Sequence, residues 1–216
     1  MSKTVVAVIV YNRFHNIQEW VKCWHKSNTK DCELVIIHNY RNDFDKKQYK
    51  AFCEQNGVTY LSRANVGFDI GAFQDLCNNR LQFPYFDYLL WCTDDLLPCR
   101  PSFIQEYLHE MTEGIICAAY EVSIEVHPHI RTTGFMLHKS TLPKIKFNVD
   151  PIRTKPDCYD FEHRDKQNSL IDQVSRFGKV VQVGDLDWSP MWDSGHNSRE
   201  AIRRRNKRVA DQKRFA

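Results

Sequence analysis

The first half of the chain alternates short runs of β-branched and aromatic residues with amphipathic segments of helical period, and this alternation restricts the fold more than any other feature. Continuous apolar runs predict buried strands, which we place at 4–11, 33–40, 58–63 and 85–92. Helices are expected between them at 16–28, in a segment closed by Gly57, and in a segment that follows a tight turn at Gly67 and Gly71. Strands that alternate with helices are joined by crossover connections. The chain is therefore expected to be an α/β protein with a mixed, mainly parallel central sheet flanked by helices.

The second half of the chain also contains apolar runs typical of strands and segments of helical period, but they alternate less regularly. A helix is expected at 102–111, and strands are expected at 114–122, 131–139 and 179–188. Leu170, Ile171 and Val174 recur at helical spacing before Gly178, which predicts another helix over 164–177. The stretch 144–160 contains Pro151 and Pro156 and shows little periodicity, so we expect it to be a loop.

Composition indicates one folded domain. The 216 residues include 42% hydrophobic and 12% aromatic residues, which is enough to form a large core and too apolar for a disordered chain. The longest apolar runs are too short to cross a bilayer, and the start of the chain lacks the features of a signal peptide. Eight cysteines without a CxxC pair indicate reduced thiols rather than disulfides or a zinc site. We therefore expect a soluble, cytoplasmic protein.

The basic residues gather near the end of the chain. Residues 196–216 contain eight Lys or Arg against two acidic residues, whereas the formal net charge of the whole chain is only +3. We expect one catalytic domain over 1–195 and a basic helix or linker over 196–216 that could lead to a further domain in a longer protein. The basic segment lacks interleaved aromatic residues, so a solvated helix face is favoured over nucleic-acid binding or an anionic membrane contact.

Polar side chains follow each of the first four predicted strands. Ligands of open α/β sheets gather at the carboxyl ends of parallel strands. After the fourth predicted strand, Asp94 and Asp95 end an apolar run. They could belong to a solvent-exposed turn or be the ligands of a divalent cation. The other strands are followed by groups suited to ring stacking, base recognition and phosphate binding, namely Tyr11, Asn12 and Arg13; His38, Asn39 and Tyr40; and Arg63, Asn65, Gly67 and Asp69. The segment GFDIG lacks the residues of a Walker loop or a GxGxxG motif.

The motifs YNR, HNY, NVGFDIGAF and DYLLWCTDDLLP, in this order, resemble glycosyltransferases of the nucleotide-sugar-dependent GT-A fold. The chain is most similar to family 2-like enzymes of the rhamnan synthesis protein F type, including viral or bacterial domains that glycosylate a coat protein. The resemblance implies a Mn²⁺- or Mg²⁺-dependent enzyme. It would move a hexose or a deoxyhexose such as rhamnose from a UDP-, GDP- or dTDP-linked donor to a hydroxyl of a glycan or glycoprotein, with inversion. A viral enzyme of this type would work in the host cytoplasm.

The resemblance also implies roles for individual residues. Asp95 would hold the metal, while Asp94 would contact the metal, the ribose or the sugar; Thr93 stands where a first Asp is common, which leaves the division between them open. Tyr11 and Asn39 would flank the base, and Arg63 and Asp69 would face the diphosphate and donor sugar. The remaining donor-side candidates are Asn12, Arg13, Asn65 and Gly67.

The acceptor side is less sharply defined. An inverting transfer needs a general base, and the resemblance implies Glu162, with Asp160 and Asp165 as rivals; Glu162 could instead be a carboxylate that stabilises a helix N-terminus. Thr133 and Gly134 would lie near the acceptor. His196 would be a third metal ligand or a surface residue.

Two other functions share these features. A nucleotidyltransferase would use the same metal and nucleotide but attack phosphorus. A nucleotide-sugar or glycan-binding domain would bind without turnover.

Overall fold

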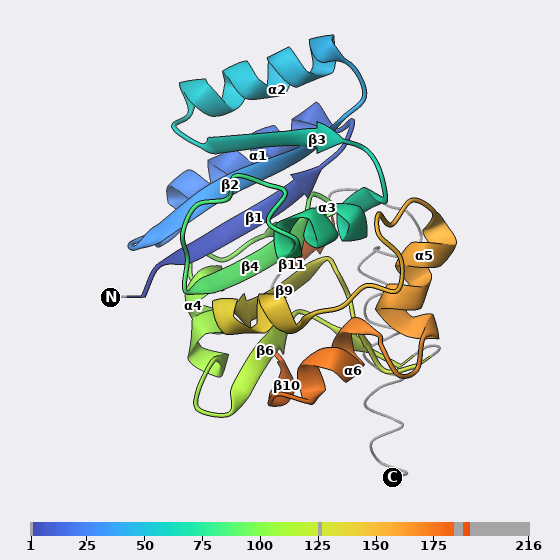
Figure 1. Cartoon of the computed structure of the whole chain (residues 1–216). Coiled ribbons are helices and arrows are strands. Elements are labelled where there is room, and N and C mark those ends of the chain that lie inside the picture. The colour runs from blue at the N-terminus through green and yellow to red at the C-terminus, as the bar shows by residue number, and fades with distance from the viewer. Residues whose placement is uncertain (1, 125–126, 184–187, 191–216) are drawn as a thin grey trace.

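A computed structural model describes residues 2–124, 127–183 and 188–190 of the chain (Figure 1). Its core is a seven-stranded sheet in the order β10-β6-β9-β4-β1-β2-β3. Only β9 runs antiparallel to its neighbours in this sheet, so the predicted mixed, mainly parallel sheet is confirmed. The strands are β1 (Thr4–Val10), β2 (Cys32–Tyr40), β3 (Thr59–Ala64), β4 (Tyr88–Thr93), β6 (Ile115–Ala119), β9 (Gly134–His138) and β10 (Lys179–Gln182).

Helices cover both faces of the sheet (Figure 1). On one face lie α1 (Phe14–Lys26), α2 (Asp43–Gln55) and α4 (Phe103–Glu110), whose apolar residues share a core with Val6, Val8 and Val10. On the other face lie α3 (Phe68–Cys77), α5 (Lys155–Tyr159) and α6 (Leu170–Ser175), which pack with Val5 and Ala7. Successive side chains of a strand point to opposite faces. The unbroken Val and Ile content of β1 therefore follows from burial on both sides.

In the part of the chain that the structure describes, four short strands lie outside the large sheet. β5 (Leu96–Pro98) pairs antiparallel with β11 (Trp188–Pro190), and β7 (Val122–Ser123) pairs with β8 (His129–Ile130). The predicted strand over 179–188 is therefore two strands in different sheets. The predicted strand over 114–122 is likewise divided between β6 and β7. Among the residues that the structure describes, no helix has the length and apolar character needed to span a bilayer.

The prediction of a loop over 144–160 is wrong in its last part, where α5 begins. The Thr154 side chain accepts a hydrogen bond from the backbone N–H of Asp157, and the Asp157 carboxylate accepts one from the backbone N–H of Thr154. This capping box satisfies the first amides of the helix. Pro156 is compatible with the first helical turn, where a missing amide N–H costs nothing. A single turn of π-helix (Asp160–Arg164) then continues α5.

The predicted helix over 164–177 is shorter than expected. Asp165 accepts hydrogen bonds from the backbone amides of Gln167 and Asn168, so the chain forms a turn there. Helix α6 begins only at Leu170, where Ser169 supplies the N-cap by accepting from the amide of Asp172. Local side-chain bonds to the backbone compete with helix formation in this way.

Candidate active site

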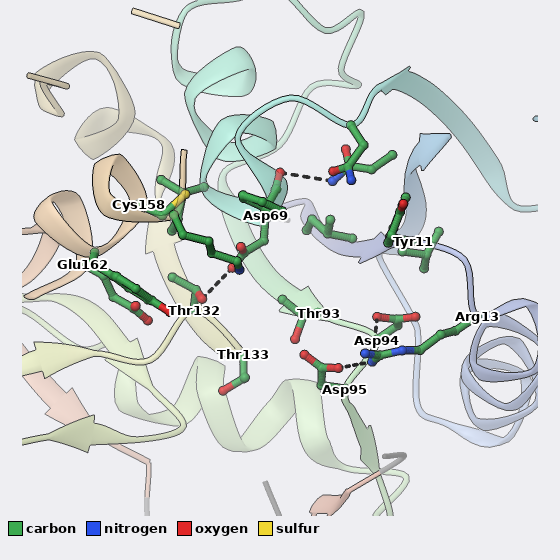
Figure 2. Close-up of a pocket in the computed structure, with 18 residues that line it drawn as sticks. Tyr11, Arg13, Asp69, Thr93, Asp94, Asp95, Thr132, Thr133, Cys158 and Glu162 are labelled. Atoms are coloured by element: carbon green, nitrogen blue, oxygen red, sulfur yellow. Dashed lines mark hydrogen bonds and ion pairs between the residues drawn. The ribbon is translucent and has the colours of Figure 1, made fainter. Parts of the chain in front are cut away.

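A cavity of about 260 Å³ opens at the carboxyl edge of the parallel strands. Its wall is formed by the ends of β1, β2 and β4, the start of α3, the residues that precede β9, and the segment from α5 into the π turn (Figure 2). Because β9 runs antiparallel to its neighbour β4, the amino end of β9 lies at the edge of the sheet where β4 ends. The topology therefore brings six separate segments to one place.

The predicted acidic pair lies at the end of β4, the central strand. The backbone N–H of Asp94 donates to the carbonyl of Ile9 at 3.0 Å, and Asn16 Nδ2 donates to the carbonyl of Asp94 at 2.9 Å. These bonds attach the end of β4 to β1 and α1. Asp94 is buried, and its burial, together with the neighbouring charge of Asp95, raises the pKa of Asp94 to about 8.

Arg13 is the cation nearest to this pair in the described part of the cavity wall. Its guanidinium donates to Oδ1 of Asp95 and lies 4.0 Å from Oδ1 of Asp94 (Figure 2). The Asp95 side chain is 26% exposed, so it faces the cavity, whereas that of Asp94 is 8% exposed. The second carboxylate oxygen of Asp94, Oδ2, is buried and has no hydrogen-bond partner among the described residues.

The acidic pair fits a divalent cation by its chemistry. Carboxylate oxygens are the ligands that Mg²⁺ and Mn²⁺ prefer, and Asp94 Oδ2 is a buried acceptor that a cation would satisfy. Within the described residues, no cluster of three or more His, Cys, Asp or Glu side chains is arranged to hold an ion. The protein thus offers two carboxylates, and such a cation would take further oxygens from donor phosphates and water.

The NVGFDIGA motif forms a strained turn that leads into α3. Gly67 has φ +70°, and Phe68 has φ +56°, a conformation that non-glycine residues rarely adopt. A Cβ on Gly67 would lie 2.4 Å from the carbonyl oxygen of Ile152, so only glycine fits there. Gly71, predicted to belong to the turn, lies inside α3 instead.

Arg63 stabilises this turn through hydrogen bonds and does not line the cavity. Its Nη2 donates to the carbonyl of Val66 at 2.7 Å, and its Nε donates to Oδ2 of Asp75 at 2.7 Å. Its Nη1 donates to Oδ1 of Asn39 at 2.9 Å, and Asn39 Nδ2 donates to the carbonyl of Phe68 at 3.1 Å. The Arg63 side chain is only 9% exposed. The prediction that Arg63 faces a diphosphate is corrected, because its donors are used to stabilise the turn.

The turn presents Asp69 to the cavity. Thr132 Oγ1 donates to Oδ2 of Asp69 at 2.7 Å (Figure 2). Burial raises the pKa of the Asp69 carboxyl; the bond from Thr132 opposes this, and the nearby charge of Glu162 adds to it. Asp69 is thus a hydrogen-bonded carboxyl at the boundary between the acidic pair and the α5 side.

Of the three candidate bases, only Glu162 lines the cavity. Its side chain is 15% exposed, and Oε2 lies 3.5 Å from Nδ1 of His163. Asp160 is exposed and borders a different, small depression. Asp165 accepts from Asn148 Nδ2 at 2.6 Å and from two backbone amides, which fixes it in the turn before α6. The structure therefore disfavours both rivals.

Nine predicted residues meet in the cavity wall: Tyr11, Arg13, Asn39, Asn65, Asp69, Asp94, Asp95, Thr133 and Glu162. Asn12 does not, because it is an exposed residue in a left-handed conformation. Gly134 pairs with Cys92 inside the sheet, and Gly67 contributes the backbone of the turn. His196 lies outside the described residues.

The cavity wall also contains Thr132, Lys155, Cys158 and Tyr159, four side chains with hydroxyl, amino or thiol groups that sequence reasoning did not single out. Lys155 places Nζ 4.0 Å from the ring centroid of Phe68, a cation–π contact across the cavity wall. Three of the four belong to α5, which was predicted to be loop. The Thr154-x-x-Asp157 spacing with Pro156 was the signal that could have located this helix.

The sequence matches no protein-family model and no curated protein. Its fold, however, is similar to solved glycosyltransferase structures. A mannosyltransferase from Pyrobaculum calidifontis, in complex with GDP-Man and Mn²⁺, superposes with a TM-score of 0.62 and 10% sequence identity. The match covers 85% of this chain and 55% of the mannosyltransferase, so the chain spans about half the length of that protein.

A second similar structure is glucosyl-3-phosphoglycerate synthase from Mycobacterium tuberculosis, in complex with Mn²⁺, UDP and glucosyl-3-phosphoglycerate. Its TM-score is 0.61 at 15% identity, and the match covers 93% of this chain and 77% of the synthase. The same synthase with Mg²⁺ and UDP gives a TM-score of 0.59. The metal ions and nucleotides belong to those proteins. For this chain, the likeness shows that it has the GT-A fold of nucleotide-sugar glycosyltransferases.

Proposed function

We propose that the chain is a metal-dependent glycosyltransferase that moves a sugar from a nucleoside diphosphate donor to a hydroxyl of a glycan or glycoprotein. One observation carries this proposal: Asp94 and Asp95 end the central strand and face Asp69 and Glu162 across a single cavity (Figure 2). An acidic pair at one end and a separate carboxylate at the other match the two needs of glycosyl transfer. The first is charge stabilisation of the leaving diphosphate, and the second is a base for the acceptor hydroxyl.

In this proposal the donor lies along the carboxyl edge of the sheet. Asp94 and Asp95 would hold Mn²⁺ or Mg²⁺, which when bound would stabilise charge on the leaving phosphate. Tyr11 has an exposed ring for stacking on a base, and Asn65 offers an amide group. Asn39 lines the same wall, but its amide is already bonded to Arg63 and to the carbonyl of Phe68, so its proposed role is to support the site rather than to bind the base. Asp69 would accept from a hydroxyl of the donor sugar while it remains bonded to Thr132. The proposed donors are UDP-, GDP- or dTDP-linked hexoses or deoxyhexoses, including rhamnose.

Glu162 is the proposed base. It would accept the proton of the acceptor hydroxyl as that oxygen attacks the anomeric carbon, which gives inversion when attack comes from the face opposite the diphosphate. Thr133 lies on the same wall and would contact the acceptor. The likeness to enzymes whose structures were solved in complex with GDP-Man or UDP supports this assignment of the cavity. A cytoplasmic location is part of the proposal, because all eight cysteines are free thiols.

A panel of UDP-, GDP- and dTDP-sugars with Mn²⁺ tests the function. We expect release of nucleoside diphosphate, which a coupled assay detects, and loss of release in Asp95→Asn. Release of pyrophosphate from a nucleoside triphosphate and a sugar phosphate would instead identify a nucleotidyltransferase. Donor binding with no release, even when candidate acceptors are added, would indicate a non-catalytic binding domain.

A further inference from the structure

The ion pair between Arg13 and Asp95 occupies the place where the proposed cation would bind. The Arg13 guanidinium donates to Oδ1 of Asp95 and lies 4.0 Å from Oδ1 of Asp94, and all three residues line the cavity (Figure 2). A guanidinium and a divalent cation cannot both sit against the same carboxylate oxygen without strong repulsion. Binding of the cation to Oδ1 of Asp95 therefore requires Arg13 to leave that oxygen.

We infer that Arg13 is an internal counter-ion that exchanges partners during donor binding. Before the donor binds, Arg13 neutralises Asp95; when a divalent cation takes Asp95, the guanidinium moves to oxygens of the donor diphosphate. This inference rests on the proposed function of the cavity. It assigns Arg13 a specific task, which is to make binding of the cation and binding of the diphosphate depend on each other.

The local structure allows this exchange without backbone movement. Arg13 directly precedes α1, and its carbonyl accepts from the amide of Asn16 at 3.0 Å, which fixes the main chain. The Arg13 side chain is 31% exposed and lines the same cavity as the exposed ring of Tyr11. A rotamer change can therefore redirect the guanidinium. Its planar donors suit two phosphate oxygens as well as they suit a carboxylate.

Charge balance explains why the two ligands would bind together. A divalent cation alone must break the Arg13–Asp95 pair and leave the guanidinium without its carboxylate. A nucleoside diphosphate alone would bring negative charge beside Asp94 and Asp95. When both bind, the cation neutralises the carboxylates and Arg13 neutralises the phosphate. Each ligand then raises the affinity for the other by the same factor, as linkage requires.

Binding measurements on the full chain test this exchange independently of turnover. Electron paramagnetic resonance gives the affinity for Mn²⁺ alone, and calorimetry gives the affinity for UDP, GDP or dTDP with and without saturating Mn²⁺. In the wild type we expect Mn²⁺ to tighten binding of the preferred nucleotide at least tenfold. In Arg13→Gln we expect Mn²⁺ alone to bind several-fold more tightly than to the wild type, and the tightening of the nucleotide by Mn²⁺ to fall below threefold.

Arg80→Gln is the matched control. Arg80 also pairs with carboxylates, Asp150 at 2.5 Å and Asp75 at 3.4 Å, but it lies away from the cavity wall. This variant should bind Mn²⁺ and nucleotide like the wild type. Thermal melting of both variants shows whether they are folded, and Arg13→Lys, which keeps the charge, should retain part of the coupling.

The outcomes separate the inference from the proposed function. Arg13→Gln that binds Mn²⁺ alone no more tightly than the wild type, or that keeps full coupling, would overturn the exchange even if the enzyme transfers sugar. Coupled binding that is lost in Arg13→Gln, without turnover of any donor, would support the exchange while contradicting the glycosyltransferase assignment. A wild type that binds no Mn²⁺ with any of the nucleotides would overturn both.

Discussion

Four carboxyl groups share the cavity wall, and their surroundings give each of them a different character. Burial and a neighbouring charge raise the pKa of Asp94 to about 8, whereas Asp95 is more exposed and paired with Arg13. Asp69 is hydrogen-bonded to Thr132, and Glu162 faces the cavity from the π turn. Carboxyl groups in different environments can serve separately as acid, base and binding group within one site. The residues can therefore be tested separately.

Glu162→Gln tests the assignment of the base. Because glutamine cannot accept the acceptor proton but keeps the side-chain shape, we expect donor binding to stay unchanged and turnover to fall by about 10²-fold or more. Calorimetry with the nucleoside diphosphate and a coupled release assay measure the two quantities. Asp160→Asn, at an exposed position outside the cavity, should retain wild-type turnover. An active Glu162→Gln enzyme would refute the assignment.

Arg63→Gln tests the structural role of this partly buried arginine. The substitution leaves Asp75 without its 2.7 Å ion pair and the carbonyl of Val66 without its donor. The Arg63–Asp75 pair is partly buried, and removing one partner of a hydrogen-bonded charged pair typically costs about 1.5 to 3 kcal/mol, so we expect the free energy of unfolding to fall by about 2 kcal/mol. Urea denaturation measures it. Arg80→Gln, at the surface, should cost about 1 kcal/mol or less; equal losses in the two variants would count against a special role for Arg63.

At the scale of secondary-structure elements, α3 and the turn before it decide where Asp69 points. The turn contains two consecutive left-handed residues, which store strain of about 1 to 3 kcal/mol at the non-glycine position. Bonds from Arg63 and Asn39 to the carbonyls of Val66 and Phe68 offset this strain. A strained backbone conformation that is maintained by several surrounding hydrogen bonds is typical of functional sites.

Gly71→Ala tests how closely α3 packs against this turn. A Cβ on Gly71 would lie 2.2 Å from the carbonyl oxygen of Val66, so the helix or the turn must shift. We expect the free energy of unfolding to fall by about 1 to 3 kcal/mol, as in other overpacked sites, and affinity for the nucleotide to weaken. Urea denaturation and calorimetry measure these effects.

Gly114→Ala is the control for this test. Gly114 has φ +81°, and a Cβ there would meet no atom within 4 Å. Alanine should cost only the strain of the left-handed conformation, about 1 to 2 kcal/mol, and leave nucleotide affinity unchanged. Nucleotide affinity that falls equally in both variants would show that packing of α3 is not the cause.

At the scale of the whole molecule, a buried histidine links β2, α2 and β3. His38 is 0% exposed, its ring stacks on Tyr49 at 3.8 Å between centroids, and its two nitrogens contact Tyr60 Oη at 3.0 Å and Asp45 Oδ2 at 3.2 Å. Burial lowers the pKa of His38, although the charge of Asp45 opposes the shift. The folded state therefore binds a proton at His38 more weakly than the unfolded chain does.

The direction of this pKa shift predicts how His38 changes the free energy of unfolding as the pH falls. As pH falls through the pKa of an unfolded histidine, about 6.5, the unfolded state takes up the proton first, so the contribution of His38 to the free energy of unfolding should decrease between pH 7 and pH 5. The raised pKa of Asp94 acts in the opposite direction over this range, so the prediction concerns the difference between two proteins: relative to the wild type, His38→Gln should lose less stability as pH falls from 7 to 5, which thermal melting across the pH range measures. Exposed His25→Gln should keep the wild-type slope. An unchanged slope in His38→Gln would show that His38 does not contribute.

The alternation of strands and helices in the first 93 residues could be read from sequence because burial and period are local properties of the chain. β1, α1, β2, α2 and β3 lie within a few residues of their predicted positions. The polar strand ends also followed from sequence, since parallel strands carry their carboxyl ends to one edge. Asp94 and Asp95 at the end of the central strand are the clearest instance.

Only the tertiary structure decided which of these polar residues face the cavity. Arg63 and Asn39 are register partners in β3 and β2, yet the Arg63 side chain turns toward the NVGFDIGA backbone, because the carbonyls of that turn need hydrogen-bond donors. Lys155 and Thr132 belong to segments that are far in sequence from the first four strands. Tertiary packing brings them to the site, and no local sequence pattern indicates those contacts. Sequence period fixes the face on which a residue lies, whereas the direction and partners of its side chain depend on long-range packing.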